Sequence, residues 1–164
     1  MDEEIKINQS SVTGAPVYYE IFKESETGNT VLKNLNSLLD DLILNNTVAR
    51  ENITILTTRR KSDCFLCDYV DQDLKLGDHQ FTSKIGSNDK ITCASVQGFR
   101  GLESQIIILG DIDGRGYKHL NYLAASRAKL MLFLLVSDRF IEKHPEFTDG
   151  CEEYTGGLDL KAIL

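Results

Sequence analysis

An unbroken apolar run, Ile106 to Leu109 within "SQIIILG", constrains the fold of this chain more than any other feature. A strand with one face in water alternates apolar and polar residues, and this stretch does not, so we expect both of its faces to be covered. A second strand-like run, "LMLFLLV", occupies 130–136. Between such runs lie stretches with helical spacing of apolar residues. Together these patterns predict an α/β fold with a parallel sheet flanked by helices on both faces.

The remaining elements follow from local patterns along the chain. "TVLKNLNSLLDDLIL" has the three-and-four spacing of an amphipathic helix, with Thr30 as its N-cap. Residues 71–90 are polar and turn-rich, with one short strand expected around 80–84. Further strands are predicted at 16–22, 52–58 and 90–96, and further helices at 61–70 and 116–129, the last running directly into 130–136.

Length and composition favour one globular domain over 1–164. The chain has 164 residues, of which 41% are hydrophobic and 26% are charged, and this is enough for a real core. The longest apolar stretch is too short to cross a bilayer, and "DEEIK" after Met1 is unlike a signal region. We therefore expect a soluble, cytoplasmic protein without membrane contact.

The charge balance argues against a free-standing nucleic-acid binder. The formal net charge is −7, whereas such proteins usually neutralise phosphates with clustered Lys and Arg. The one basic cluster is Arg59-Arg60-Lys61. Any contact with nucleic acid is therefore expected to be local, or to depend on another domain.

Four cysteines leave two interpretations open. Cys64 and Cys67 have the two-residue gap of a zinc knuckle, but no second knuckle is present, and Cys93 and Cys151 lie elsewhere. The pattern favours ordinary reduced thiols over a metal site, and no metal is expected.

Arg127 is unusual because it falls among the apolar residues of the helix predicted at 116–129. A desolvated guanidinium needs an anion or a route to water. It could reach the surface and compensate the helix dipole. Alternatively it could project toward a phosphate, to which its planar, permanently charged fork is well suited.

Polar residues also collect after two predicted strands. Ligands of open parallel sheets bind beyond the carboxyl ends of strands, where this chain has Arg59 and Arg60 and then Asp111 and Asp113. No GxxxxGK[ST] motif occurs, so the chain is expected to lack a phosphate loop of its own.

Two of these segments carry a family resemblance. "SVQGFRGLESQIIILGDID" (95–113) followed by "LNYLAASRAKLMLFLLV" (120–136) resembles the fifth and sixth motifs of superfamily 1 helicases of the UvrD/Rep type. "NITILTTRR" is similar to their fourth motif. The resemblance covers about 50–137 and implies a RecA-like, P-loop NTPase-type domain from the C-terminal half of such a helicase.

For the nucleotide, the resemblance implies ATP and Mg²⁺ held mainly by an N-terminal RecA-like domain that this sequence lacks. Arg127 would be the catalytic arginine that reaches the γ-phosphate, and Glu103 would lie near the nucleotide sugar. Gly101 would permit the turn that presents Glu103. Arg59, with Arg60 as the alternative register, would be the fourth-motif arginine at the nucleotide.

For the nucleic acid, the resemblance implies single-stranded DNA contacted through Ser95 and Gln97. Gln97 stands where the family usually has histidine, and Arg100 where it has lysine.

The missing first domain implies a fragment of a longer chain, or a subunit that needs a partner, without ATPase activity by itself. Two rival hypotheses remain: a degenerate RecA-like module with a regulatory or protein-binding role, and a stand-alone nucleotide-binding domain.

Overall fold

A single parallel sheet of seven strands forms the centre of the computed structural model, which describes residues 16–25, 28–57, 59, 64–85, 89–99, 101–113 and 128–163. The strand order is β5-β6-β4-β7-β8-β1-β9, and every pairing between these strands is parallel. This confirms the predicted α/β class with a parallel sheet. The strands are β1 (Val17–Phe22), β4 (Ile53–Thr57), β5 (Phe81–Thr82), β6 (Ile91–Ser95), β7 (Ser104–Ile112), β8 (Ala128–Ser137) and β9 (Glu152–Glu153).

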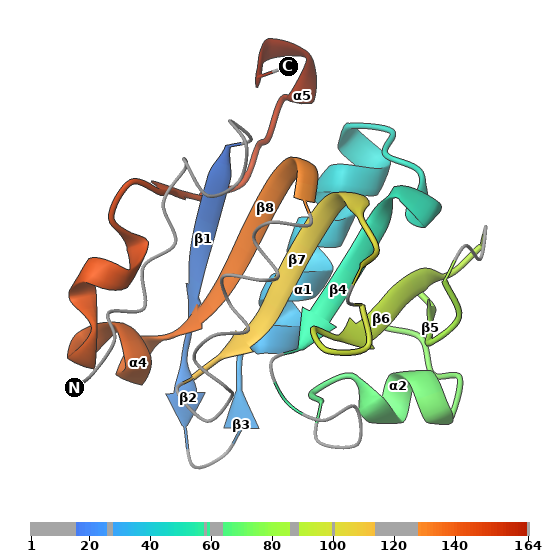
Figure 1. Ribbon diagram of the computed structural model, residues 1–164, viewed down its shortest axis with the longest axis horizontal. Coiled ribbons are helices and arrows are strands. Elements are labelled where there is room, and N and C mark those ends of the chain that lie inside the picture. Colours follow the sequence, from blue (N-terminus) through green and yellow to red (C-terminus); the bar gives the residue numbers. More distant parts are fainter. Residues whose placement is uncertain are drawn as a thin grey trace.

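Helices pack against both faces of the sheet. Helix α1 (Val31–Asp40) lies behind β4 and β7 in Figure 1, and α4 (Asp138–Lys143) directly follows β8. Leu35 and Leu38 of α1 belong to one apolar cluster, whereas Phe140 of α4 belongs to the other. The remaining elements are α2 (Cys67–Asp71), α5 (Leu160–Ile163), a π-helix at Asp41–Asn45, short 3-10 helices at Arg50–Asn52 and Pro145–Thr148, and an antiparallel pair of β2 (Glu24–Ser25) with β3 (Gly28–Asn29).

Strand β7 explains the bare apolar run. Ile106 and Ile108 point into the cluster on the α1 side, and Ile107 and Leu109 point into the cluster on the α4 side. All four side chains are at most 2% exposed. Burial of each contributes about 1.5 to 3 kcal/mol, so both faces of this strand stabilise the fold.

The first helix is only partly as predicted. Residues 31–40 are α-helical, and the following turn, Asp41–Asn45, is a π-helix. Thr30 occupies the N-cap position, but its hydroxyl accepts a hydrogen bond from the backbone N–H of Lys23 (2.8 Å) instead of capping the helix. The hydroxyl therefore ties the end of β1 to the start of α1.

Two other helix predictions need correction. Within the predicted 61–70 helix, residues 64–66 form turns and the helix starts at Cys67, while 61–63 lie outside the described residues. Of the predicted 116–129 helix, 116–127 lie outside the described residues, and Ala128 and Lys129 are in β8 instead. Ala128 pairs with Ser104 of β7, so Ala128 and Lys129 belong to the sheet and not to a helix.

The strand predictions agree closely with β1, β4, β6, β7 and β8. No helix in the described ranges combines the length and the apolar character that crossing a membrane requires.

Candidate functional site

The amino edge of the sheet brings the two helicase-like segments together. Glu103 immediately precedes β7, and Lys129 is the second residue of β8. Lys129 Nζ lies 3.2 Å from Glu103 Oε2, and both side chains are about half exposed, at 53% and 55%. Such an exposed pair contributes only about 0 to 1 kcal/mol, so either charge can exchange its partner for a ligand at little cost.

A β-bulge shapes this edge. Ser104 pairs with Ala128 but Ile106 pairs with Met131, so two residues of β8 lie opposite one residue of β7. Lys129 and Leu130 are these two residues of β8, and they lie opposite Gln105 of β7. Bulges re-aim side chains at functional edges. Sequence reasoning missed Lys129 because it assigned this residue to a helix.

A pocket of about 240 Å³ opens beside the bulge. Leu130 and Met131 of β8 and Ile106 of β7 form apolar walls, and Gln105 and Asn52 contribute amide groups. Its volume is below the roughly 300 to 1,000 Å³ of complete small-molecule sites. The pocket is therefore large enough for one part of a ligand, with the rest held outside it.

The turn between β6 and β7 positions Glu103. The N–H of Phe99 donates to the carbonyl of Ser95 (3.0 Å), and that of Leu102 donates to the carbonyl of Phe99 (3.1 Å). Gly101 has φ +81°, a conformation that side-chain-bearing residues rarely adopt. This confirms the prediction that glycine at this position permits the backbone turn before Glu103.

Ser95 and Gln97 lie at the other end of β6. The Ser95 hydroxyl accepts a hydrogen bond from the N–H of Gly98 (2.9 Å), which fixes the start of the turn. Gln97 is exposed just beyond the strand. Both residues therefore belong to the carboxyl edge of the sheet.

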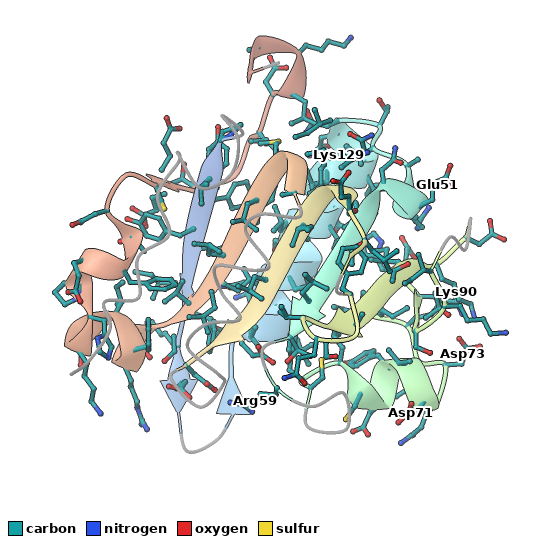
Figure 2. All side chains as sticks on the ribbon, in the orientation of Figure 1. Glu51, Arg59, Asp71, Asp73, Lys90 and Lys129 are labelled. Atoms are coloured by element: carbon teal, nitrogen blue, oxygen red, sulfur yellow. The ribbon has the colours of Figure 1, made fainter. Side chains whose placement is uncertain are left out.

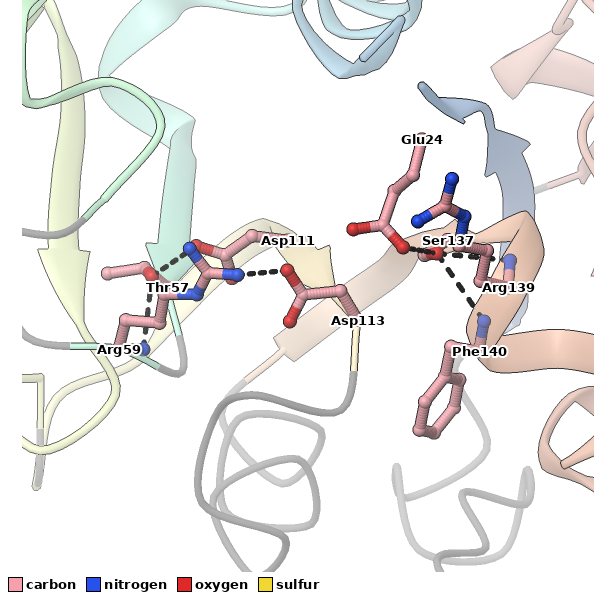
Figure 3. A network of polar contacts seen from close by, with 8 residues as sticks. All are labelled: Glu24, Thr57, Arg59, Asp111, Asp113, Ser137, Arg139 and Phe140. Atoms are coloured by element: carbon pink, nitrogen blue, oxygen red, sulfur yellow. Dashed lines mark hydrogen bonds and ion pairs between the residues drawn. The ribbon is translucent and has the colours of Figure 1, made fainter. Parts of the chain in front are cut away.

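Arg59 and Asp113 meet at this carboxyl edge, as Figure 3 shows. The guanidinium forms an ion pair with the carboxylate, and the two side chains are only 22% and 6% exposed. Nε of Arg59 is buried without a hydrogen-bond partner. Beside them the Thr57 hydroxyl donates to Asp111 Oδ2 (2.5 Å). The expected gathering of arginine and carboxylates is confirmed for Arg59, Asp111 and Asp113, while Thr57 gave no signal in the sequence.

The same edge continues to the start of α4. Ser137 accepts hydrogen bonds from the N–H groups of Arg139 (3.2 Å) and Phe140 (3.4 Å), so it caps the helix. Its own hydroxyl donates to Glu24, as drawn in Figure 3. The N–H of Glu24 donates in turn to Asp138 (3.1 Å). These contacts connect the segment that follows β1 to the carboxyl end of β8.

The residues predicted to bind ligands thus divide between two opposite edges. Figure 2 shows Lys129, the partner of Glu103, at one end of the strands and Arg59 at the other. Nine residues of β7 separate the edges, which corresponds to about 26 Å. One mononucleotide cannot contact both ends of such a strand. Arg60 and Arg127 lie outside the described residues.

The cysteine spacing does not reflect the arrangement in space. Cys64 Sγ lies 3.9 Å from Cys93 Sγ, and the Cys67 Sγ instead lies 3.9 Å from an oxygen of Asp68. Among the described residues, no three His, Cys, Asp or Glu side chains are grouped as a metal site would require.

Comparisons with known proteins agree with this architecture. No protein-family model and no curated protein matches the sequence. Among solved structures, the chain is similar to the C-terminal domain of a possible DNA helicase from Lactobacillus plantarum WCFS1, with a TM-score of 0.62 and 15% sequence identity. The match covers 90% of this chain and 98% of the other. At this identity the likeness shows a shared fold, which is the RecA-like α/β fold expected from the sequence.

Proposed function

We propose that this chain is the C-terminal RecA-like motor domain of a cytoplasmic superfamily 1 DNA helicase of the UvrD/Rep type. The observation that carries the proposal is the meeting of the two signature segments at one edge. "GLE" directly precedes β7 and "RAK" ends in the first residues of β8, where Ser104 pairs with Ala128. Segments separated along the chain therefore contribute to one surface, as a composite nucleotide site requires.

At the amino edge the expected ligand is ATP with Mg²⁺. The chain has no phosphate loop, so an N-terminal RecA-like domain of the same protein, or a partner subunit, would hold the phosphates and the metal. The exposed carboxylate of Glu103 fits this division of roles because it can accept hydrogen bonds from sugar hydroxyls. Lys129 pairs with that carboxylate in the free domain, and the sugar of a bound nucleotide would take the place of Lys129.

Arg127 is the proposed catalytic arginine, and it precedes Ala128, the first residue of β8. A guanidinium stabilises the charge that develops on the transferring phosphoryl group, and such arginines contribute about 10³- to 10⁵-fold to turnover. ATP supplies the free energy, and domain closure and opening would move the strand.

At the carboxyl edge the proposed ligand is single-stranded DNA. Ser95 and Gln97 lie there, and so does Arg59. The separation of about 26 Å from the Glu103 edge favours a nucleic-acid role for Arg59 over the nucleotide role expected from the sequence. To bind a phosphate, Arg59 must first exchange Asp113 for it, so we expect weak binding that salt readily suppresses.

The catalytic assignment is tested in the full-length protein that contains this domain. Arg127→Ala should lower ATP hydrolysis about a thousandfold or more and leave ATP affinity within about tenfold, and Arg127→Lys should rescue little. Arg139→Ala is the matched control, because Arg139 is an exposed arginine beyond the carboxyl end of β8. It should leave both quantities unchanged. Near-normal ATPase activity in Arg127→Ala, with an unchanged melting temperature, would refute the assignment.

The edge assignment is tested separately by fluorescence anisotropy with single-stranded DNA at low salt. Arg59→Ala should weaken binding and reduce its salt dependence, whereas Glu103→Gln should not affect DNA binding. Equal loss in both variants would contradict the division into two edges.

A second candidate is a degenerate RecA-like module with a regulatory or protein-binding role. It is favoured by the internal neutralisation of both candidate charges, Arg59 by Asp113 and Glu103 by Lys129. A full-length protein without a phosphate loop, or without ATPase activity, would support this candidate over the motor.

A further inference from the structure

Two buried thiols from separate segments face each other in the core. Cys64 lies in the turn before α2, and Cys93 lies at the centre of β6. Their Sγ atoms are 3.9 Å apart, although the residues are 29 positions apart in the sequence. Both side chains are 4% exposed and belong to the apolar cluster on the α1 side. The fold therefore holds two thiols in contact where water is nearly excluded.

The surroundings of Cys64 favour its reactive form. The thiol contact with Cys93 lowers the pKa of Cys64, and this outweighs the opposing effect of burial. The N–H of Leu66 also points at Cys64 Sγ, at 3.4 Å. A thiolate accepts such hydrogen bonds better than a thiol does. These two contacts favour the thiolate form of Cys64.

Cys67, the partner that the sequence spacing suggests, is less suited to this chemistry. Burial, and then the carboxylate of Asp68, raises the pKa of its thiol. Its Sγ is directed to that same carboxylate.

We propose that Cys64 and Cys93 form a reversible disulfide when the protein meets a hydroperoxide. The Cys64 thiolate attacks one peroxide oxygen, the O–O bond breaks, and Cys64 becomes a sulfenic acid while water, or an alcohol from an organic peroxide, leaves. Cys93 sulfur then attacks Cys64 sulfur and releases the sulfenic oxygen as a second water. Two thiols lose two electrons and two protons, and the peroxide accepts them.

The sulfur atoms must close from 3.9 Å to about 2.05 Å. The turn at residues 64–66 can supply this movement because it is not held in a sheet. The disulfide would link β6 to the segment that follows β4. Strand β4 ends just before Arg59, and β6 ends at Ser95. Oxidation would thus restrict the edge proposed for nucleic acid, although the disulfide itself does not depend on that function.

The test is peptide mapping of the purified chain after treatment with hydrogen peroxide, with and without a thiol reductant. We expect a mass loss of about 2 Da and one cross-linked peptide pair joining Cys64 to Cys93, which the reductant separates. The melting temperature should rise by roughly 5 to 10 °C, because the cross-link restricts the unfolded chain. Cys93→Ala should abolish the cross-link, and Cys67→Ala, the matched control, should retain it.

Three outcomes would overturn the proposal. These are a wild-type protein that keeps both thiols after oxidation of Cys67 and Cys151, a cross-link joining Cys64 to Cys67, and a cross-link of Cys64 or Cys93 between two molecules on a non-reducing gel. The wild-type and Cys67→Ala maps remain decisive if Cys93→Ala fails to fold.

Discussion

Glu20 in β1 makes the stability of this protein depend on pH near neutrality. Its Oε2 atom is buried without a hydrogen-bond partner, and its side chain borders a pocket of about 360 Å³ shared with Asp41 and Tyr154. Burial, and then the charge of Glu153, raises the pKa of Glu20 to about 7 from its ordinary value of 4.5. At pH 8 the folded protein must therefore hold a poorly solvated carboxylate.

The sign and size of the effect follow from this difference in pKa. A raised pKa means that the folded state binds the proton more tightly, so the contribution of Glu20 to stability is fully present below about pH 4.5 and is lost as pH rises through about 7. At about 1.36 kcal/mol per pH unit, the upper limit is about 3.4 kcal/mol. Because the side chain is only half-buried, solvent screening reduces our expectation to about 2 kcal/mol.

Glu20→Gln removes the titrating group and keeps the shape. In urea unfolding followed by circular dichroism, the variant should be about 2 kcal/mol more stable than wild type at pH 8 and nearly equal to it at pH 4.5. Glu142→Gln, at an exposed glutamate of α4, is the control and should show no pH-dependent difference. A constant difference at all pH values, or a less stable Glu20→Gln variant at pH 8, would refute the reasoning.

Three further substitutions test the fold. A Cβ on Gly110 would lie 2.4 Å from the ring of Phe65, so Gly110→Ala should cost about 1 to 3 kcal/mol in unfolding free energy, less in a Phe65→Ala background. Asp41 accepts hydrogen bonds from Tyr154 (2.6 Å) and from the backbone at 158 (2.9 Å). Asp41→Asn should therefore lower the free energy of unfolding by about 2 kcal/mol and speed hydrogen exchange in residues 154–160. Exchange that speeds up equally along the whole chain would contradict the idea that Asp41 holds this segment in place. Ser137→Ala should lose about 1 kcal/mol through the cap of α4, and an unchanged thermal melt would show that the cap is dispensable.

Hydrogen bonds at Asp41 also explain why that carboxylate remains charged in the core. Burial alone raises the pKa of Asp41, but donors from Asn45, Tyr154 and the backbone of Leu158 outweigh it and lower the pKa. Asn45 is a local partner, but Tyr154 and Leu158 lie 113 and 117 positions away, and nothing local in the sequence marks them as partners of Asp41.

The candidate site was predictable in composition but not in arrangement. Gly101 and Glu103 belong to one short segment, and the need for glycine in that turn could be seen from the sequence. The ion pair between Glu103 and Lys129 could not be foreseen, because it depends on a bulge in the pairing of β7 with β8. The opposite placement of Arg59 and Glu103, by contrast, follows from the predicted parallel sheet, because Arg59 comes after the end of β4 and Glu103 comes before the start of β7.

The sequence by itself determined the parallel sheet and the strands at its centre. Ile106 to Leu109 lack alternation, and a chain can bury such a run only where both faces are covered, so this inference needed no knowledge of distant residues. Tertiary structure alone decided which side chains meet: Cys64 contacts Cys93 and not Cys67, and Arg59 pairs with Asp113. The physical reason is that parallel strands bring the turns at their ends close to residues 29 to 54 positions away, and these partners depend on strand order and register, which local patterns do not contain.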